Sequence, residues 1–243
     1  MKDEHSLFLH YDRILQDFQD LLHTPFRQYR KESDSSVPVG FLDLPEKKEG
    51  SFSYESREER LLGLQRLTEQ IRRCSRCGLA EGRTMAVPGM GVLDPLVLVV
   101  GEGPGAEEDK QGLPFVGAAG QFLDKWLESI GLSRKENVYI TNIVKCRPPG
   151  NRDPRPEEAE SCFPYLEQQV VYIRPKAILT VGRIAAQSLL HTSKGIGTLR
   201  ESLHRWKDIP LIATYHPSAV LRDPGLKRPV WEDLKRLKAF LHG

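Results

Sequence analysis

The sequence predicts a three-layer α/β/α fold, with a central sheet of four parallel strands between helices and a helical extension at the N-terminus. Four short, nearly continuous apolar runs alternate with stretches of helical periodicity, and such runs are typical of strands buried on both faces. Helices that cross over between parallel strands cover both faces of such a sheet. The predicted strands are 96–100, 138–144, 177–181 and 211–214, and the predicted helices are 57–73, 120–130, 156–171, 183–190 and 230–241.

The first 56 residues differ from the rest. Apolar residues recur at three- and four-residue steps over 6–30, which predicts an amphipathic helix. The segment 31–56, rich in Ser, Pro, Gly and charge, predicts a linker. The helix either docks on the core or binds a partner protein or a second copy. Residues 1–56 carry 7 Lys and Arg against 11 Asp and Glu, whereas 57–243 carry 28 against 22, a net charge of +6 that suits a polyanionic partner.

Neither membrane insertion nor secretion is expected. No stretch approaches the ~20 consecutive apolar residues that a membrane-spanning helix needs. The N-terminus starts acidic and has no apolar run of signal-peptide length, so we expect a cytoplasmic protein.

Four cysteines predict one metal site. The chain contains Cys74, Cys77, Cys146 and Cys162 and no others, as one C-x2-C pair and two residues that flank a proline-rich stretch. Two disulfides would need an oxidising compartment, and a redox dithiol would leave two cysteines unexplained; unrelated buried cysteines are a further alternative. Four thiolates hold zinc or an iron–sulfur cluster. Zinc usually recruits two tight pairs, which favours the cluster, although spacing does not decide the metal.

Ligands of parallel α/β sheets bind outside the carboxyl ends of the strands. The first predicted strand leads into the turn 101–105, whose glycines allow close backbone approach to a ligand, and then into three carboxylates at 107–109. The alternative is a tight turn with a solvated acidic face. Asn142 is a polar residue within an apolar strand, so it needs a hydrogen-bond partner in the protein or on a ligand. Phe115, read alone, is typical of the core, and His216 follows the last strand.

Together these segments resemble the family 4 uracil-DNA glycosylases, which contain a [4Fe–4S] cluster. The likeness covers roughly residues 60–243, and the cysteine spacing fits the four ligands of that cluster. The motifs that carry it are 101–109, Pro114-Phe115-Val116-Gly117, 140–149, His216–Arg222 and 226–234. The implied fold is that of the uracil-DNA glycosylases, and the implied activity is monofunctional hydrolysis of the N-glycosidic bond of uracil in base excision repair.

The resemblance also implies roles for single residues. Phe115 would stack on a flipped uracil, Asn142 would read its Watson–Crick edge, and Gly103 would complete the uracil site. His216 would stabilise the anion that develops on the departing base. Glu108 is the first choice to position the attacking water, and Glu102 is the second.

The implied partner is uracil-containing DNA, single- or double-stranded, in the nucleoid of a prokaryotic cytoplasm. Five residues are expected at the DNA, three of them as a wedge that enters the minor groove: Pro104, Ser218, and the wedge residues Val220, Leu221 and Arg222. We expect a monomer, with helix 6–30 available to a partner protein. The alternative function is a catalytically inactive iron–sulfur module that binds DNA or proteins of replication or repair.

Overall fold

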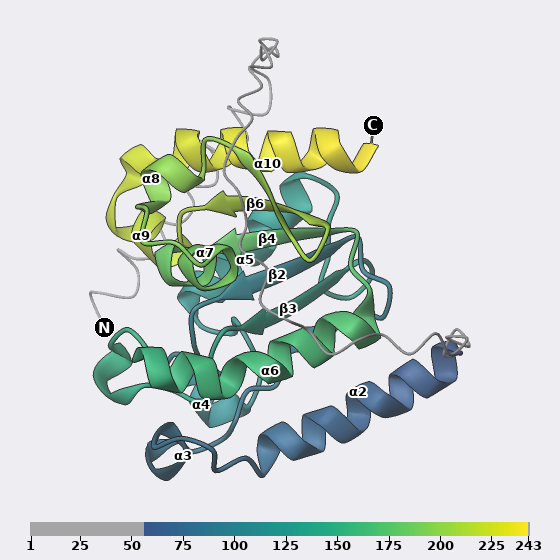
Figure 1. The fold of residues 1–243 in the computed structure, drawn as a ribbon. Coiled ribbons are helices and arrows are strands. Elements are labelled where there is room, and N and C mark those ends of the chain that lie inside the picture. Colours follow the sequence, from purple (N-terminus) through teal and green to yellow (C-terminus); the bar gives the residue numbers. More distant parts are fainter. Residues whose placement is uncertain (1–55, 243) are drawn as a thin grey trace, which may run out of the picture.

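The computed structural model of the chain describes residues 56–242 (Figure 1). The helix predicted over 6–30 and the linker predicted over 31–56, apart from Ser56, lie outside these residues. Among the residues described, no helix combines the length and the apolar character that crossing a membrane requires.

The centre of the sheet confirms the predicted parallel strands. They are β2 (Val97–Gly101), β3 (Val138–Asn142), β4 (Ala177–Val181) and β6 (Ile209–Thr214). Neighbouring strands pair in parallel in the order β3-β2-β4-β6. Every residue of β2, β3 and β4 is buried, as expected for strands covered on both faces.

The sheet is wider than predicted, because a short antiparallel strand pairs with each edge. The strand β1 (Met90–Gly91) pairs with β3, and β5 (Leu203–Trp206) pairs with β6. The sheet therefore has six strands in mixed orientation. Neither edge strand has an apolar signature: β1 has two residues, and in β5 only Trp206 is buried.

Helices cover both faces and form the three layers (Figure 1). One face packs against α6 (Pro156–Ile173) and α7 (Arg183–Leu190), and the other against α5 (Ala118–Ser129) and α10 (Lys227–His242); α2 (Arg57–Arg72) packs against α6. All five predicted helices are present, with ends shifted by a few residues. Because side chains of a strand point alternately to its two faces, β2 contributes to both cores.

Shorter helices lie in the connections. The sequence did not predict them as helices, since three to six residues are too few for a clear periodicity. They are α3 (Leu79–Gly82), α4 (Ala106–Gln111), α8 (Ile196–Leu199), α9 (Pro217–Arg222) and the 3-10 turns η1 (Pro149–Asn151) and η2 (Pro224–Leu226).

The parallel register brings the predicted site residues to one edge of the sheet. Gly101, the last residue of β2, pairs with Asn142, the last residue of β3. Thr214 ends β6 and is followed two residues later by His216. The loops that leave these three strands therefore start from the same carboxyl edge.

A buried carboxylate anchors the end of β6 to α10. Asp233 has no solvent exposure; its Oδ2 accepts hydrogen bonds from Thr214 Oγ1 at 2.7 Å and from Arg200 Nε at 2.9 Å. Its Oδ1 accepts from Arg200 Nη2 at 2.9 Å and also from Arg236. The network fixes the direction in which the chain leaves β6 towards His216.

Replacing this carboxylate should destabilise the fold. Asp233→Ala leaves the Arg200 guanidinium and the Thr214 hydroxyl without their partner, and breaking a buried ion pair typically costs about 3–5 kcal/mol. For a domain of this size that corresponds to a decrease in Tm of roughly 6–20 °C. Glu232→Ala is the matched control, since its half-exposed side chain pairs with exposed Arg228. Equal Tm changes in the two variants would contradict an anchoring role.

Candidate functional site

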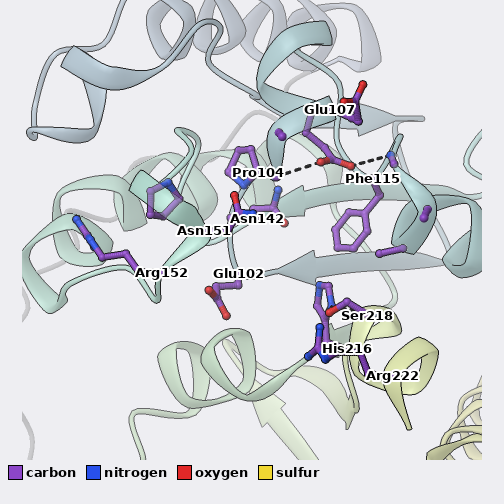
Figure 2. Close-up of a pocket in the computed structure, with 18 residues that line it drawn as sticks. Glu102, Pro104, Glu107, Phe115, Asn142, Asn151, Arg152, His216, Ser218 and Arg222 are labelled. Carbon is purple, nitrogen blue, oxygen red and sulfur yellow. Dashed lines mark hydrogen bonds between the residues drawn. The ribbon is translucent and has the colours of Figure 1, made fainter. Parts of the chain in front are cut away.

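A cavity of about 470 Å³ opens at the carboxyl edge of the sheet. Its lining comes from the β2–α4 loop, the segment before α5, the end of β3, the η1 turn and the loop into α9 (Figure 2). The lining includes most of the predicted site residues: Glu102, Gly103, Pro104, Glu108, Phe115, Asn142, His216, Ser218 and Arg222.

Phe115 forms one wall of this cavity. Its side chain is almost fully buried, and its ring centroid lies 5.8 Å from that of His216 (Figure 2). The backbone of Phe115 has a φ of +52°, in the left-handed region that residues other than glycine seldom adopt. The ring therefore stands in the cavity on a strained backbone.

Asn142 offers a hydrogen-bonding group that the protein leaves unused. The residue is 1% exposed, and its Oδ1 has no hydrogen-bond partner within residues 56–242. A buried polar atom of this kind costs about 1–3 kcal/mol when it stays unsatisfied. The amide is therefore poised to bind a group that enters the cavity.

The space beside Asn142 exists because position 101 has no side chain. A Cβ at Gly101 would lie 2.4 Å from Asn142 Oδ1 and 2.6 Å from Phe115 Cζ. Since both distances are shorter than a van der Waals contact, only glycine at position 101 leaves the amide and the ring where they are.

His216 is neutral and its tautomer is fixed. The backbone N–H of Ser218 donates to His216 Nδ1 at 3.2 Å, and the Ser218 hydroxyl lies 2.7 Å from the same nitrogen. A backbone N–H can only donate, so Nδ1 is the acceptor and the proton of the neutral ring is on Nε2. Burial, together with the positive charge of Arg222, lowers the pKa of the imidazole to about 4, and the negative charge of Glu108 opposes this shift only partly. At neutral pH the ring is therefore an uncharged donor.

Glu102 differs from an ordinary surface carboxylate. Burial and the negative charge of Asp153 together raise the pKa of the Glu102 carboxyl to about 7, against the opposing positive charge of Arg183. Asp153 and Arg183 form an ion pair with each other at 2.5 Å. Glu102 can thus take up or release a proton near neutral pH.

Glu108 is occupied by the backbone around it. Its Oε1 accepts hydrogen bonds from the N–H groups of Val116 and Gly117, both at 2.9 Å, and its Oε2 accepts from Gly105 N at 3.1 Å. The carboxylate ties the start of α4 to the segment that follows Phe115. These contacts leave it less free to position a water than the sequence suggested.

The predicted wedge is only partly exposed. Val220 is completely buried in the core between the sheet and the helices α5 and α10, so its side chain cannot enter a DNA groove. Leu221 packs partly against the same core, and Arg222 is exposed and lines the cavity. The wedge prediction is therefore wrong for Val220, because α9 turns this position inwards.

Two residues at the end of the η1 turn, the last residue of the turn and the one after it, were not among the predicted site residues. Asn151 and Arg152 line the cavity (Figure 2). Arg152 is held by Glu158 of α6 through two hydrogen bonds, at 2.8 and 2.7 Å. The sequence did carry a signal, because this loop follows the carboxyl end of a predicted strand.

The four cysteines line a second, much smaller cavity, bordered by α2, α3 and α6. Three N–H groups donate to their sulfurs: Arg83 Nη1 to Cys146 at 3.0 Å, Lys145 N to Cys162 at 3.3 Å and Arg76 N to Cys74 at 3.4 Å. Such donors stabilise thiolate ligands and tune a bound cluster. In the described part of the chain, no three His, Cys, Asp or Glu side chains stand close enough to hold a single metal ion.

The buried thiols of Cys146 and Cys162 do not lose their protons readily in the absence of a metal. Burial raises the pKa of Cys162 to about 11 and raises the pKa of Cys146 above its ordinary value. A bound cation would displace these protons, because metal ligation deprotonates thiols. The shared cavity and the N–H donors therefore fit a group that binds four thiolates.

Lys145 joins the two cavities. Its side chain is buried, and Nζ donates to Thr141 Oγ1 at 2.6 Å, to the Asn142 carbonyl oxygen at 2.7 Å and to Gln169 Oε1 at 2.9 Å. The next residue, Cys146, lies among the four cysteines. One short segment thus connects the unpartnered amide to the cysteine site.

Gly101→Ala should impair whatever the main cavity binds. The added Cβ would displace Asn142 or Phe115, and a shift of about 1 Å in a positioned group can cost a hundredfold in rate. Gly195→Ala is the control, since a Cβ there would meet nothing within 4 Å. The measurement is turnover of the substrate proposed below; equal rates for the two variants would show that Gly101 does not shape the site.

Comparison with known proteins agrees with this geometry. Residues 88–235 match the model of the uracil DNA glycosylase superfamily. The chain is 45% identical to a type-4 uracil-DNA glycosylase of Archaeoglobus fulgidus, 43% to one of Pyrobaculum aerophilum and 42% to one of Thermotoga maritima. These alignments cover 70%, 71% and 72% of this chain and 89%, 92% and 93% of the relatives. The chain therefore belongs to the uracil DNA glycosylase superfamily, within its type-4 group.

Proposed function

We propose that this protein removes uracil from DNA as a monofunctional glycosylase, hydrolysing the N-glycosidic bond and leaving an abasic site for repair. The observation that carries the proposal is the buried, unpartnered Oδ1 of Asn142, which lies in the same cavity as the ring of Phe115. The type-4 relatives are named for the same activity.

Recognition begins with taking the base out of the stack, which costs a few kcal/mol. The Phe115 ring compensates by stacking on the flipped base, a contact worth about 1–3 kcal/mol. Asn142 Oδ1 accepts the N–H of the uracil ring, and its amide group donates to a uracil carbonyl. Cytosine has no hydrogen on that ring nitrogen and carries an amine in place of the carbonyl, so it leaves the amide unsatisfied.

Bond cleavage moves the bonding electrons onto the departing uracil. His216 is suited to meet that negative charge, because its neutral ring has the proton on Nε2 while Nδ1 is held by Ser218. A fixed donor aimed at developing charge is worth about 3–4 kcal/mol. Backbone N–H groups around Gly103 would add to this stabilisation.

We propose that Glu102, rather than Glu108, positions and activates the attacking water. Both oxygens of Glu108 already accept backbone N–H groups, whereas Glu102 lines the cavity with a pKa of about 7. A general base works best when its pKa lies near the working pH. In its ionised form Glu102 takes a proton from the water as the water attacks the sugar carbon.

DNA would approach along the mouth of the cavity. Pro104, Ser218 and Arg222 line it, and Leu221 lies beside them on α9. We propose that Leu221 and Arg222 fill the gap left by the flipped base. We expect the protein to act as a monomer. A protein partner for helix 6–30 stays a prediction, as does association with the nucleoid.

We further propose that the four cysteines hold a [4Fe–4S] cluster. The cluster would supply a covalent cross-link through its iron–thiolate bonds. The cysteines themselves join the segment after α2 to the end of the β3 loop and to α6, and Arg83 and Lys145 orient two of the sulfurs. These residues would thereby fix the start of the loop that carries Asn151 and Arg152.

The excision activity is tested with an oligonucleotide that contains a single uracil. The expected result is strand cleavage that requires alkali after incubation, as for a monofunctional enzyme. His216→Ala should lower the single-turnover rate by roughly a hundredfold, since one charge-stabilising donor is lost. His242→Ala, an exposed histidine of α10, is the control. Absence of cleavage by folded protein would favour the inactive binding module instead.

The pH dependence tests Glu102. Because the ionised carboxylate is the base, the single-turnover rate should rise by roughly tenfold per pH unit up to about pH 7 and then level off. Asp153→Asn should move this midpoint to lower pH, and Arg183→Gln should move it to higher pH, as their charges dictate. Glu102→Gln should remove most of the rate and the pH dependence. Shifts of equal sign in the two charge variants would contradict the assignment.

The cluster is tested by its colour and by chemical analysis. Purified protein should be brown and contain iron and sulfide, and Cys162→Ser should lose both and unfold at a lower temperature. Ser193→Ala, a change at an exposed position that does not line the cysteine cavity, is the control and should keep them. Zinc without sulfide in the native protein would overturn the cluster proposal.

A further inference from the structure

The strained backbone of Phe115 needs support from its surroundings. Left-handed φ values at residues other than glycine persist only where neighbouring groups hold them, and they occur often in ligand sites. Among the residues other than glycine that line the main cavity, two have such a φ value: Phe115 and, in the η1 turn, Asn151. The groups that hold Phe115 therefore bear on the position of its ring.

Arg134 holds the carbonyl side of this segment. Its Nη1 donates to the Pro114 carbonyl oxygen at 3.0 Å, and its Nη2 donates to the Phe115 carbonyl oxygen at 2.9 Å. Its Nε donates to Asp124 Oδ1 of α5 at 2.8 Å. The Arg134 side chain is 13% exposed and does not line the cavity. The planar guanidinium thus joins two consecutive carbonyls to a carboxylate on a rigid helix.

Two further groups close the same segment from other sides. Glu108 Oε1 accepts the N–H groups of Val116 and Gly117, the two residues after Phe115. On α5, a Cβ at Gly120 would lie 1.9 Å from the Phe115 carbonyl oxygen. The peptide of Phe115 is therefore confined by Arg134, by Glu108 and by the bare backbone of Gly120.

We propose that Arg134, fixed by Asp124, is a positioning residue for uracil binding, which sets the place of the Phe115 ring without touching the base. The proposal rests on the stacking role of Phe115 put forward above. A guanidinium is needed because a lysine ammonium has no planar fork that reaches two carbonyls and a carboxylate at once.

Inhibition by free uracil isolates this role, because it reports the base site and not the DNA surface. Arg134→Gln should raise the inhibition constant for uracil about tenfold and lower single-turnover excision by a similar factor, while affinity for undamaged DNA stays unchanged. Arg134→Lys should give an intermediate value. Arg57→Gln, which removes an exposed ion pair with Asp94, is the control and should leave all three quantities unchanged.

Two variants keep the test decisive if Arg134→Gln does not fold. Asp124→Asn weakens the anchor of the guanidinium, and Gly120→Ala displaces the same carbonyl from α5; each should raise the uracil inhibition constant. A folded Arg134→Gln protein with the native constant overturns the proposal, as does a parallel loss of DNA affinity. Phe115→Ala tests the stacking role separately. If this variant keeps the native inhibition constant for uracil, Phe115 does not stack on the base.

Discussion

The buried ammonium of Lys145 is the constraint on which the arrangement of both sites depends. A cation in the interior costs several kcal/mol unless hydrogen-bonding acceptors surround it. Its three N–H groups have three oxygen acceptors, on Thr141, Asn142 and Gln169. Those acceptors come from the end of β3 and from α6, so the charge fixes how the chain leaves the sheet. The amide of Asn142 lies on one side of this exit and Cys146 on the other.

The main cavity is organised before any ligand enters it. Nδ1 of His216 is occupied, the Phe115 peptide is held on both sides, and Gly101 keeps the space beside the amide open. A site whose donors are already oriented does not have to reorganise during the reaction, which is the main source of electrostatic stabilisation of a transition state. The uncharged imidazole of His216 is also a suitable donor, because the negative charge that it would stabilise develops only as the N-glycosidic bond breaks.

Much of this could be predicted from the sequence, because buried parallel strands are apolar throughout and their carboxyl ends collect ligand-binding loops. The edge strands escaped prediction, since β1 is two residues long and β5 has four residues of which only Trp206 is buried. The burial of Val220 depends on the direction of the short helix α9, which no local pattern reveals. The engagement of Glu108 depends on backbone groups eight and nine residues away, and Arg134 lies 19 residues from the carbonyl it holds. Such contacts between distant positions are properties of the folded chain.

The position of Lys145 also restricts how the sequence can change over evolutionary time. The five residues from Thr141 to Lys145 include the amide of Asn142 and the buried ammonium of Lys145. The backbone N–H of Lys145 also donates to the sulfur of Cys162. A descendant that lost its cysteines would still carry a buried cation whose acceptors fit only the present path of the chain. Because these acceptors are oxygens and not cysteine sulfurs, positions 141 and 169 could change only together with position 145, even in a chain without the four cysteines.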